Sequence, residues 1–388
     1  MSIVMGGGVY SVLRRAAREA ARLKKTTIGV DDVLFGMLGR YPLLRSVIPV
    51  RPQQQPRRRR RRSEASNVLT CDVELSGELT LEVVRAMREA YWRSFGWPGP
   101  ARDRFAEALG WEAPAVAVLR LAAHLAVRRR APYVGSPHVL EALLEDPGRH
   151  AHEYLVSDQI VPGRLDAVVA RLWPQGDREP PRPGLAGPLQ EVGVIAREPG
   201  RKTGRLKRCL VLSVARLFAE TTPALNWLEL EAVAETVRLG HDRTSPAHLM
   251  MGVLVLEEEM QAGDLRPVSP SDAANEMLLG RLGVTRQDAA LRVAKASYGT
   301  ELAESRPKRS WQTDRNNPPW TAAAARIAER ARELGNLGAR MPAGSAHLVY
   351  AAVTDSDDTG RELLADLGVD PRAVRDLAAA RLGLPRQM

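Results

Sequence analysis

Three histidines occupy the same position in a short sequence that recurs along the chain. They are His138, His248 and His347, and Asp32 takes this position in the first copy. Imidazole and carboxylate groups are common zinc ligands and general bases, so the set could bind a metal or transfer protons. Because the copies lie about 100 residues apart, we favour a different interpretation. Each is a polar residue in the first turn of a buried helix, hydrogen-bonded to the preceding loop, and we predict no metal site and no cofactor.

The recurring sequence, called the box below, combines a small residue, a helix cap, a polar residue and an apolar run. The four boxes are GVDDVLFGML from 29, GSPHVLEALL from 135, SPAHLMMGVL from 245 and GSAHLVYAAV from 344. They begin 106, 110 and 99 residues apart. Serine is a preferred cap, so we expect Ser136, Ser245 and Ser345 to precede and cap a helix in their boxes.

An amphipathic helix is expected before each box. Apolar or small residues recur at steps of three and four within residues 9–25, 115–127, 224–240 and 321–335. Two repeats also end alike, with a glycine stop at Gly283 or Gly368 followed by the caps Thr285 or Asp370. With few β-branched clusters, this periodicity predicts an all-α fold made of tandem helical repeats.

Composition narrows the class of protein. The chain has 388 residues, of which 44% are hydrophobic but only 5% aromatic, which suits cores of Leu, Val and Ala. The two cysteines, Cys71 and Cys209, lack a CxxC partner, which favours a reducing compartment over a disulfide or zinc framework. We find no apolar stretch of the ~20 residues that a membrane span needs and no secretion signal. We therefore expect a cytoplasmic protein without a membrane partner.

Proline- and glycine-rich stretches divide the chain into two pseudo-duplicated domains. WPQGDREPPRPGLAGP, which begins at Trp173, is the best linker candidate. The expected boundaries are 1–175 for the first repeat pair, with an arginine-rich loop at 51–66, then a linker at 176–205, and 206–388 for the second pair. An additional helix is expected from residue 79 inside the first domain.

A run of six arginines supplies much of the formal net charge of +10. The run consists of Arg57, Arg58, Arg59, Arg60, Arg61 and Arg62. Such a run repels itself and favours a solvated loop that could contact nucleic acid or an acidic partner. No aromatic residues are interleaved for stacking on single strands. We therefore favour a tolerated insertion and keep nucleic-acid binding as an alternative.

The pattern resembles the Clp N-terminal domain, the substrate- and adaptor-binding module of ClpA- and ClpC-type unfoldases. The closest agreement is in VRLGHDRTSPAHLMMGVL, and in WTAAAARIAER followed by GSAHLVYAAV and LLADLGVD. It covers most of residues 206–388 and, more weakly, 8–48 and 111–173. The resemblance implies an all-helical, non-catalytic module built from pairs of four-helix repeats, whose partners are proteins or peptides.

In ClpC-like members, a glutamate in the box and a threonine at the start of the preceding helix hold phosphoarginine. The glutamate position is here occupied by Asp31, Pro137, Ala247 and Ala346, and the threonine position by Gly6, Glu112, Thr222 and Thr321. No repeat keeps both groups, so the resemblance does not predict phosphoarginine binding in the usual way. Asp31, Thr222 and Thr321 remain the candidate partner-binding residues.

The expected function is thus non-catalytic protein or peptide binding, as an adaptor, decoy or regulator of Clp protease substrate selection. The partners would be Clp components or their substrates. EPGRKTGR at 198–205 departs from the phosphate-loop pattern, because Arg201 separates the glycine from the lysine. We therefore expect no AAA+ motor and no enzyme. Sequestration of peptide antibiotics that target Clp N-terminal domains is an alternative, as is nucleic-acid association through the arginine run.

Overall fold

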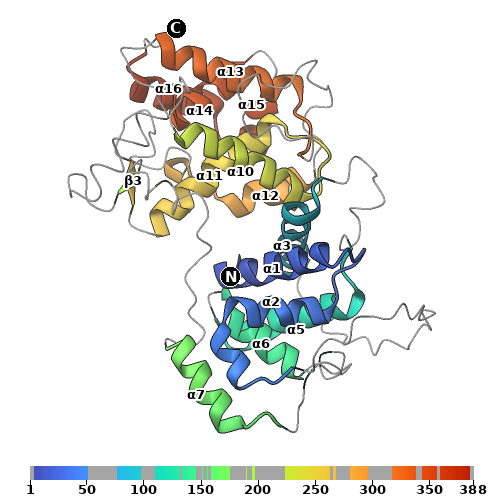
Figure 1. Cartoon of the computed structure of the whole chain (residues 1–388). Helices are drawn as coiled ribbons and strands as arrows, with labels where there is room; N and C mark the ends of the chain where they lie inside the picture. The colour runs from blue at the N-terminus through green and yellow to red at the C-terminus, as the bar shows by residue number, and fades with distance from the viewer. Residues whose placement is uncertain are drawn as a thin grey trace, which may run out of the picture. The chain divides into compact units, whose positions relative to one another are not determined.

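The computed structural model is built from helices, in agreement with the predicted all-α class (Figure 1). It describes residues 4–50, 77–97, 110–131, 133–145, 151, 155, 159–174, 189, 195–196, 223–262, 265–267, 280–295, 317–337, 343–355 and 359–384. Across these residues there are 13 α-helices and four two-residue strands. None of the described helices combines the length and the apolar character required to cross a membrane.

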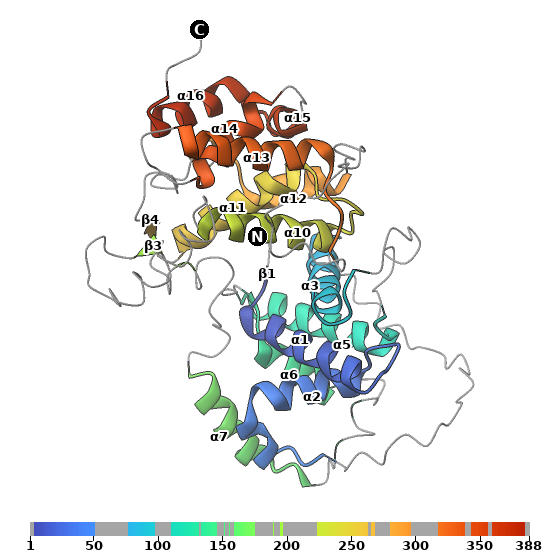
Figure 2. The ribbon, with the colours of Figure 1, turned by 45° about the horizontal axis from the view of Figure 1, so that its top comes forward.

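Two compact units make up the chain, Met1–Arg182 and Pro183–Met388, here called unit 1 and unit 2. The division falls inside residues 176–205, the range that the sequence assigns to a linker. Part of that range is structured, because Ile195–Ala196 form strand β3. This strand pairs antiparallel with β4, Arg266–Pro267, in unit 2 (Figure 2).

Unit 1 contains two helical hairpins and two further α-helices among its described residues. Its elements are β1 (Val4–Met5), α1 (Gly7–Arg22), α2 (Val30–Arg40), η1 (Pro42–Ser46), α3 (Gly77–Phe95), α5 (Ala113–Arg128), β2 (Tyr133–Val134), α6 (Ser136–Glu145) and α7 (Pro162–Leu172). The buried face of α1 follows helical spacing from Val9 through Leu13 to Ala20. Helices α1 and α2 pack closely, as do α5 and α6. The helix expected from residue 79 is α3.

Unit 2 repeats the hairpin arrangement. Its remaining elements are α10 (Pro223–Leu239), α11 (Pro246–Ala262), η5 (Gly280–Leu282), α12 (Arg286–Lys295), α13 (Ala322–Leu337), α14 (Ser345–Thr354), α15 (Thr359–Asp366) and α16 (Pro371–Leu382). Helices α10 and α11 form one hairpin and α13 and α14 the other, and α16 packs on α14 (Figure 2). The predicted stops have left-handed backbones, with φ of 76° at Gly283 and 74° at Gly368.

Short parallel pairings join the two hairpins of each unit in a crossed manner. In unit 1, β1 precedes α1 and pairs with β2, which precedes α6. Conversely, Ile28 before α2 pairs with Trp111 before α5. In unit 2, Thr244 before α11 pairs with Trp320 before α13. The start of the first helix in one repeat therefore lies beside the box of the other repeat.

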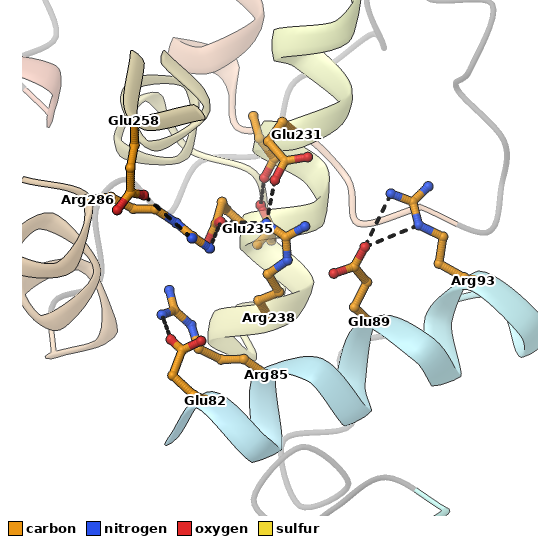
Figure 3. A network of polar contacts seen from close by, with 11 residues as sticks. Glu82, Arg85, Glu89, Arg93, Glu231, Glu235, Arg238, Glu258 and Arg286 are labelled. Atoms are coloured by element: carbon orange, nitrogen blue, oxygen red, sulfur yellow. Dashed lines mark hydrogen bonds and ion pairs between the residues drawn. The ribbon is translucent and has the colours of Figure 1, made fainter. Parts of the chain in front are cut away.

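Buried charges in unit 2 are neutralised within α10 and by an arginine of α12 (Figure 3). Arg238 in α10 has no exposed surface and forms ion pairs with Glu231 and with Glu235, the latter at 2.5 Å. Arg286 at the start of α12 reaches Glu235 at 3.1 Å and Glu258 in α11 at 3.8 Å. The pairs of Arg286 connect α12 to α10 and α11, while those of Arg238 stay within α10. Buried Arg238 and Glu235 therefore both have counter-ions.

Helix α3 of unit 1 carries ion pairs along its own length, also drawn in Figure 3. Arg85 pairs with Glu82 at 2.5 Å, and Arg93 pairs with Glu89 at 3.4 Å. These are i,i+3 and i,i+4 pairs, which support helix formation in a segment rich in charge.

Candidate binding site

The polar residue of every box accepts a hydrogen bond from the backbone N–H three residues earlier. Gly29 donates to Asp32 Oδ2 at 2.9 Å. The other three donors are Gly135, Ser245 and Gly344, whose N–H groups lie 3.0, 3.0 and 3.1 Å from Nδ1 of His138, His248 and His347. All four side chains are buried. Each one satisfies the N-terminus of a box helix, and each lies in its own repeat.

The box serines differ from their expected role as caps. Helices α6 and α14 begin at Ser136 and Ser345 themselves, so Gly135 and Gly344 are the capping residues. In both helices the histidine at the third helical position accepts the N–H of this glycine. Only Ser245 precedes its helix, α11. Ser136 instead accepts a hydrogen bond from the hydroxyl of Tyr41 at 2.8 Å.

One box histidine belongs to a hydrogen-bonded pair that the sequence did not single out. His248 Nδ1 accepts from Ser245 N–H, so its proton lies on Nε2, 3.1 Å from His241 Nδ1. Burial, and to a smaller extent the neighbouring His241, hold the pKa of His248 well below its usual range. Ser245 and His248 are only 2% and 1% exposed. This serine–histidine contact is therefore buried at the start of α11.

The crossed pairing brings two carboxylates together at the first box. Asp31, at the start of α2, and Glu112, at the start of α5, come from different repeats, and both approach Gly29. A Cβ atom on Gly29 would be 2.5 Å from Asp31 Oδ1 and 3.0 Å from Glu112 Oε2. Sequence comparison within single repeats had matched Asp31 with Gly6, which the fold instead places beside the second box.

A lysine and a threonine hold this carboxylate pair in place. Lys25 Nζ lies 2.5 Å from Asp31 Oδ2 and 2.8 Å from Asp32 Oδ1. Thr27 donates to Glu112 Oε1 at 2.8 Å. Burial, with Asp31 nearby, raises the pKa of Asp32 to about 6 despite the bond from Lys25. The carboxylates of Asp31 and Glu112 thus form an anionic seam between two repeats, here called the Gly29 seam.

The remaining candidate residues are not part of the Gly29 seam. Thr321 is 1% exposed, and its hydroxyl accepts the N–H of Ala324 at 3.2 Å, so it caps α13. It lies beside the third box, where Ala247 takes the carboxylate position. Thr222 is outside the described residues. So is the arginine run Arg57, Arg58, Arg59, Arg60, Arg61 and Arg62.

Comparison with known proteins does not assign the chain to a family or a function. No protein-family model matches the chain, and no curated protein matches it significantly. Within the described residues there is no group of three His, Cys, Asp or Glu side chains that could hold a metal ion.

The histidine cap of α14 predicts a pH-dependent stability. Burial lowers the pKa of His347 to about 4, against about 6.5 in an unfolded chain. A lowered pKa contributes stability above the unfolded value that is lost as the pH falls toward 4. We expect His347→Asn, which keeps an acceptor but does not titrate, to remove on the order of 1 kcal/mol of this dependence. Urea unfolding at pH 7 and pH 4.5 measures it, and an unchanged dependence would contradict it.

Proposed function

We propose that this chain is a non-catalytic module that binds proteins or peptides through the seams between its paired repeats. Its role would be that of an adaptor, decoy or regulator in Clp protease substrate selection. The resemblance of the four boxes to Clp N-terminal repeats supports the connection with Clp. The helical fold and the crossed pairing of repeats are compatible with it.

The observation that carries the proposal is the Gly29 seam. Asp31 and Glu112 each have one oxygen engaged, by Lys25 and by Thr27 respectively. Their other oxygens approach Gly29, at 2.5 and 3.0 Å from the position of a Cβ atom on that residue. A guanidinium or ammonium group would complement these carboxylates. A phosphoryl group would be repelled by both, because neither partner is the neutral threonine that the resemblance would require.

The proposed partner at this seam is therefore a peptide with an unmodified arginine or lysine. We expect a fluorescent arginine-containing peptide to bind the full chain more tightly than its phosphoarginine counterpart. Asp31→Asn combined with Glu112→Gln should weaken binding of the unmodified peptide at least ~10-fold, since each charge-assisted hydrogen bond contributes about 1.5–3 kcal/mol. Fluorescence anisotropy at constant ionic strength measures both affinities.

A matched control removes two carboxylates from an exposed helix face. Glu329→Gln combined with Glu333→Gln changes the net charge equally, on α13, and should leave peptide affinity unchanged. Tighter binding of the phosphoarginine peptide, or equal losses in both variants, would overturn the assignment of this seam. Absence of Clp subunits, their substrates and their adaptors from complexes captured with the full chain would overturn the connection with Clp.

A further inference from the structure

The net positive charge of the chain is concentrated in unit 1. Residues 1–182 contain 29 of the 56 Lys and Arg residues and 20 of the 46 Asp and Glu residues. Unit 1 therefore carries +9 of the formal charge of +10, and unit 2 carries +1. A general preference for arginine in the sequence does not explain this difference, because unit 2 has nearly as many basic residues balanced by acidic ones.

Part of this charge forms an exposed face on helix α1. Arg14, Arg18 and Arg22 follow one another at intervals of four residues, about 6 Å apart along the helix axis, and Arg15 adjoins them. All four side chains are exposed. The one acidic residue among them, Glu19, pairs with Arg22 at 2.5 Å. We call these four arginines the α1 basic face.

The first helix of another repeat, α13 of the fourth repeat, shows that a helix of this kind does not require the charge. Counted from the helix-start residues Gly6 and Thr321, Arg14 and Arg18 correspond to Glu329 and Glu333 of α13. Arg15 corresponds to Arg330, which pairs with Glu333 at 2.9 Å. The same surface is thus electrically balanced in the fourth repeat and strongly basic in the first.

The chemistry of the α1 basic face selects among anionic partners. Guanidinium groups bind phosphate oxygens through paired hydrogen bonds. An amphipathic helix binds a membrane surface by placing its apolar face in the lipid, but the apolar face of α1 is buried in the core, with Val9, Val12 and Leu13 all at 0% exposure. The face offers no aromatic residue for stacking on a single strand.

We propose that unit 1 binds the phosphate backbone of double-stranded DNA through the α1 basic face. The contact is independent of base sequence, because the arginines neutralise phosphates along the duplex. It uses a surface distinct from the Gly29 seam, and it does not depend on the peptide-binding function. It also differs from contact through the arginine run at residues 57–62, which a deletion can separate from it.

The test measures binding of the full chain to a labelled 24-base-pair duplex at several salt concentrations. Arg15→Gln combined with Arg18→Gln should weaken binding about 10-fold. It should also lower the slope of log affinity against log salt by about 1.8, because each lost phosphate contact contributes about 0.9. The matched control, Arg326→Gln combined with Arg330→Gln on α13, removes the same charge and should change neither quantity. Circular dichroism confirms that both variants remain folded.

Several outcomes would overturn the proposal. One is an equal loss of DNA affinity in the α1 and α13 double variants, and another is DNA binding that does not depend on salt concentration. A third is DNA binding that disappears on deletion of residues 51–63 but persists in the α1 double variant. Stronger binding to vesicles containing phosphatidylserine than to the duplex would instead identify a membrane as the partner. Stronger binding to an acidic protein would likewise exclude DNA as the partner of this face.

Discussion

Replacement of Arg332 by alanine is expected to lower the free energy of unfolding of unit 2 by about 3–5 kcal/mol, because it leaves a buried carboxylate without its counter-ion. Arg332 in α13 and Glu229 in α10 form an ion pair, and each side chain is only 4% exposed. Urea unfolding of the full chain, followed by hydrogen exchange of α10 and α13 amides, measures this loss within unit 2.

A double variant distinguishes loss of the ion pair from loss of packing. Counted from the helix starts, Leu13 and Ala123 of unit 1 occupy the positions of Glu229 and Arg332, and both are fully buried. Glu229→Leu combined with Arg332→Ala therefore gives unit 2 the two apolar residues that unit 1 buries at these positions. We expect the double variant to unfold within about 1 kcal/mol of the parent protein. If it were as unstable as Arg332→Ala alone, the ion pair would not explain the defect.

The ion pair between Glu229 and Arg332 also predicts how the destabilisation caused by Arg332→Ala changes with pH. Burial raises the pKa of Glu229 to about 7, although Arg332 opposes the shift, against about 4.3 in an unfolded chain. A raised pKa contributes stability that is fully present below the unfolded value and lost as the pH rises through 7. Removing Arg332 takes away the group that opposes the shift. The defect of Arg332→Ala should therefore be larger at pH 8 than at pH 5.

Helical periodicity predicted the hairpins because that information is local. The segments 9–25 and 224–240 were identified from the spacing of their apolar residues, and they form α1 and α10. The pair Glu229 and Arg332 has no such local signal, since its members are separated by 103 residues. Burial of Glu229 contradicts the usual exposure of glutamate, and only the partner helix explains it.

The Gly29 seam could be predicted only in part, because it is formed by residues of two different repeats. The sequence identifies Asp31 as the carboxylate at the glutamate position of a box, and Glu112 as a helix-start residue, but compares each with residues of its own repeat. The pairing of Ile28 with Trp111 joins different repeats, and no sequence period reveals such a crossing. Lys25 and Thr27 lacked a motif altogether, because their roles depend on a loop conformation that the paired repeat fixes.

Close contact between the two helices of the first hairpin leads to a second large expected effect. We expect Gly36→Ala to destabilise unit 1 by about 3 kcal/mol, at the upper end of the usual range for overpacking. A Cβ atom at Gly36 would lie 2.5 Å from the carbonyl oxygen of Val12 and 3.0 Å from the amide nitrogen of Ala16. Both atoms belong to the backbone of α1, so the new methyl group is accommodated only if α1 and α2 separate.

The same substitution three residues further along α2 provides the control. A Cβ atom at Gly39 would meet only the flexible side chain of Arg15, at 3.7 Å or more. Gly39→Ala should therefore stabilise unit 1 by about 0.5–1 kcal/mol, as alanine does in a helix. Gly252→Ala should have an intermediate effect on unit 2, since its nearest atom, the carbonyl oxygen of Leu228, would be 2.9 Å away. Equal effects at Gly36 and Gly39, measured by urea unfolding, would show that α1 and α2 are not held at this distance.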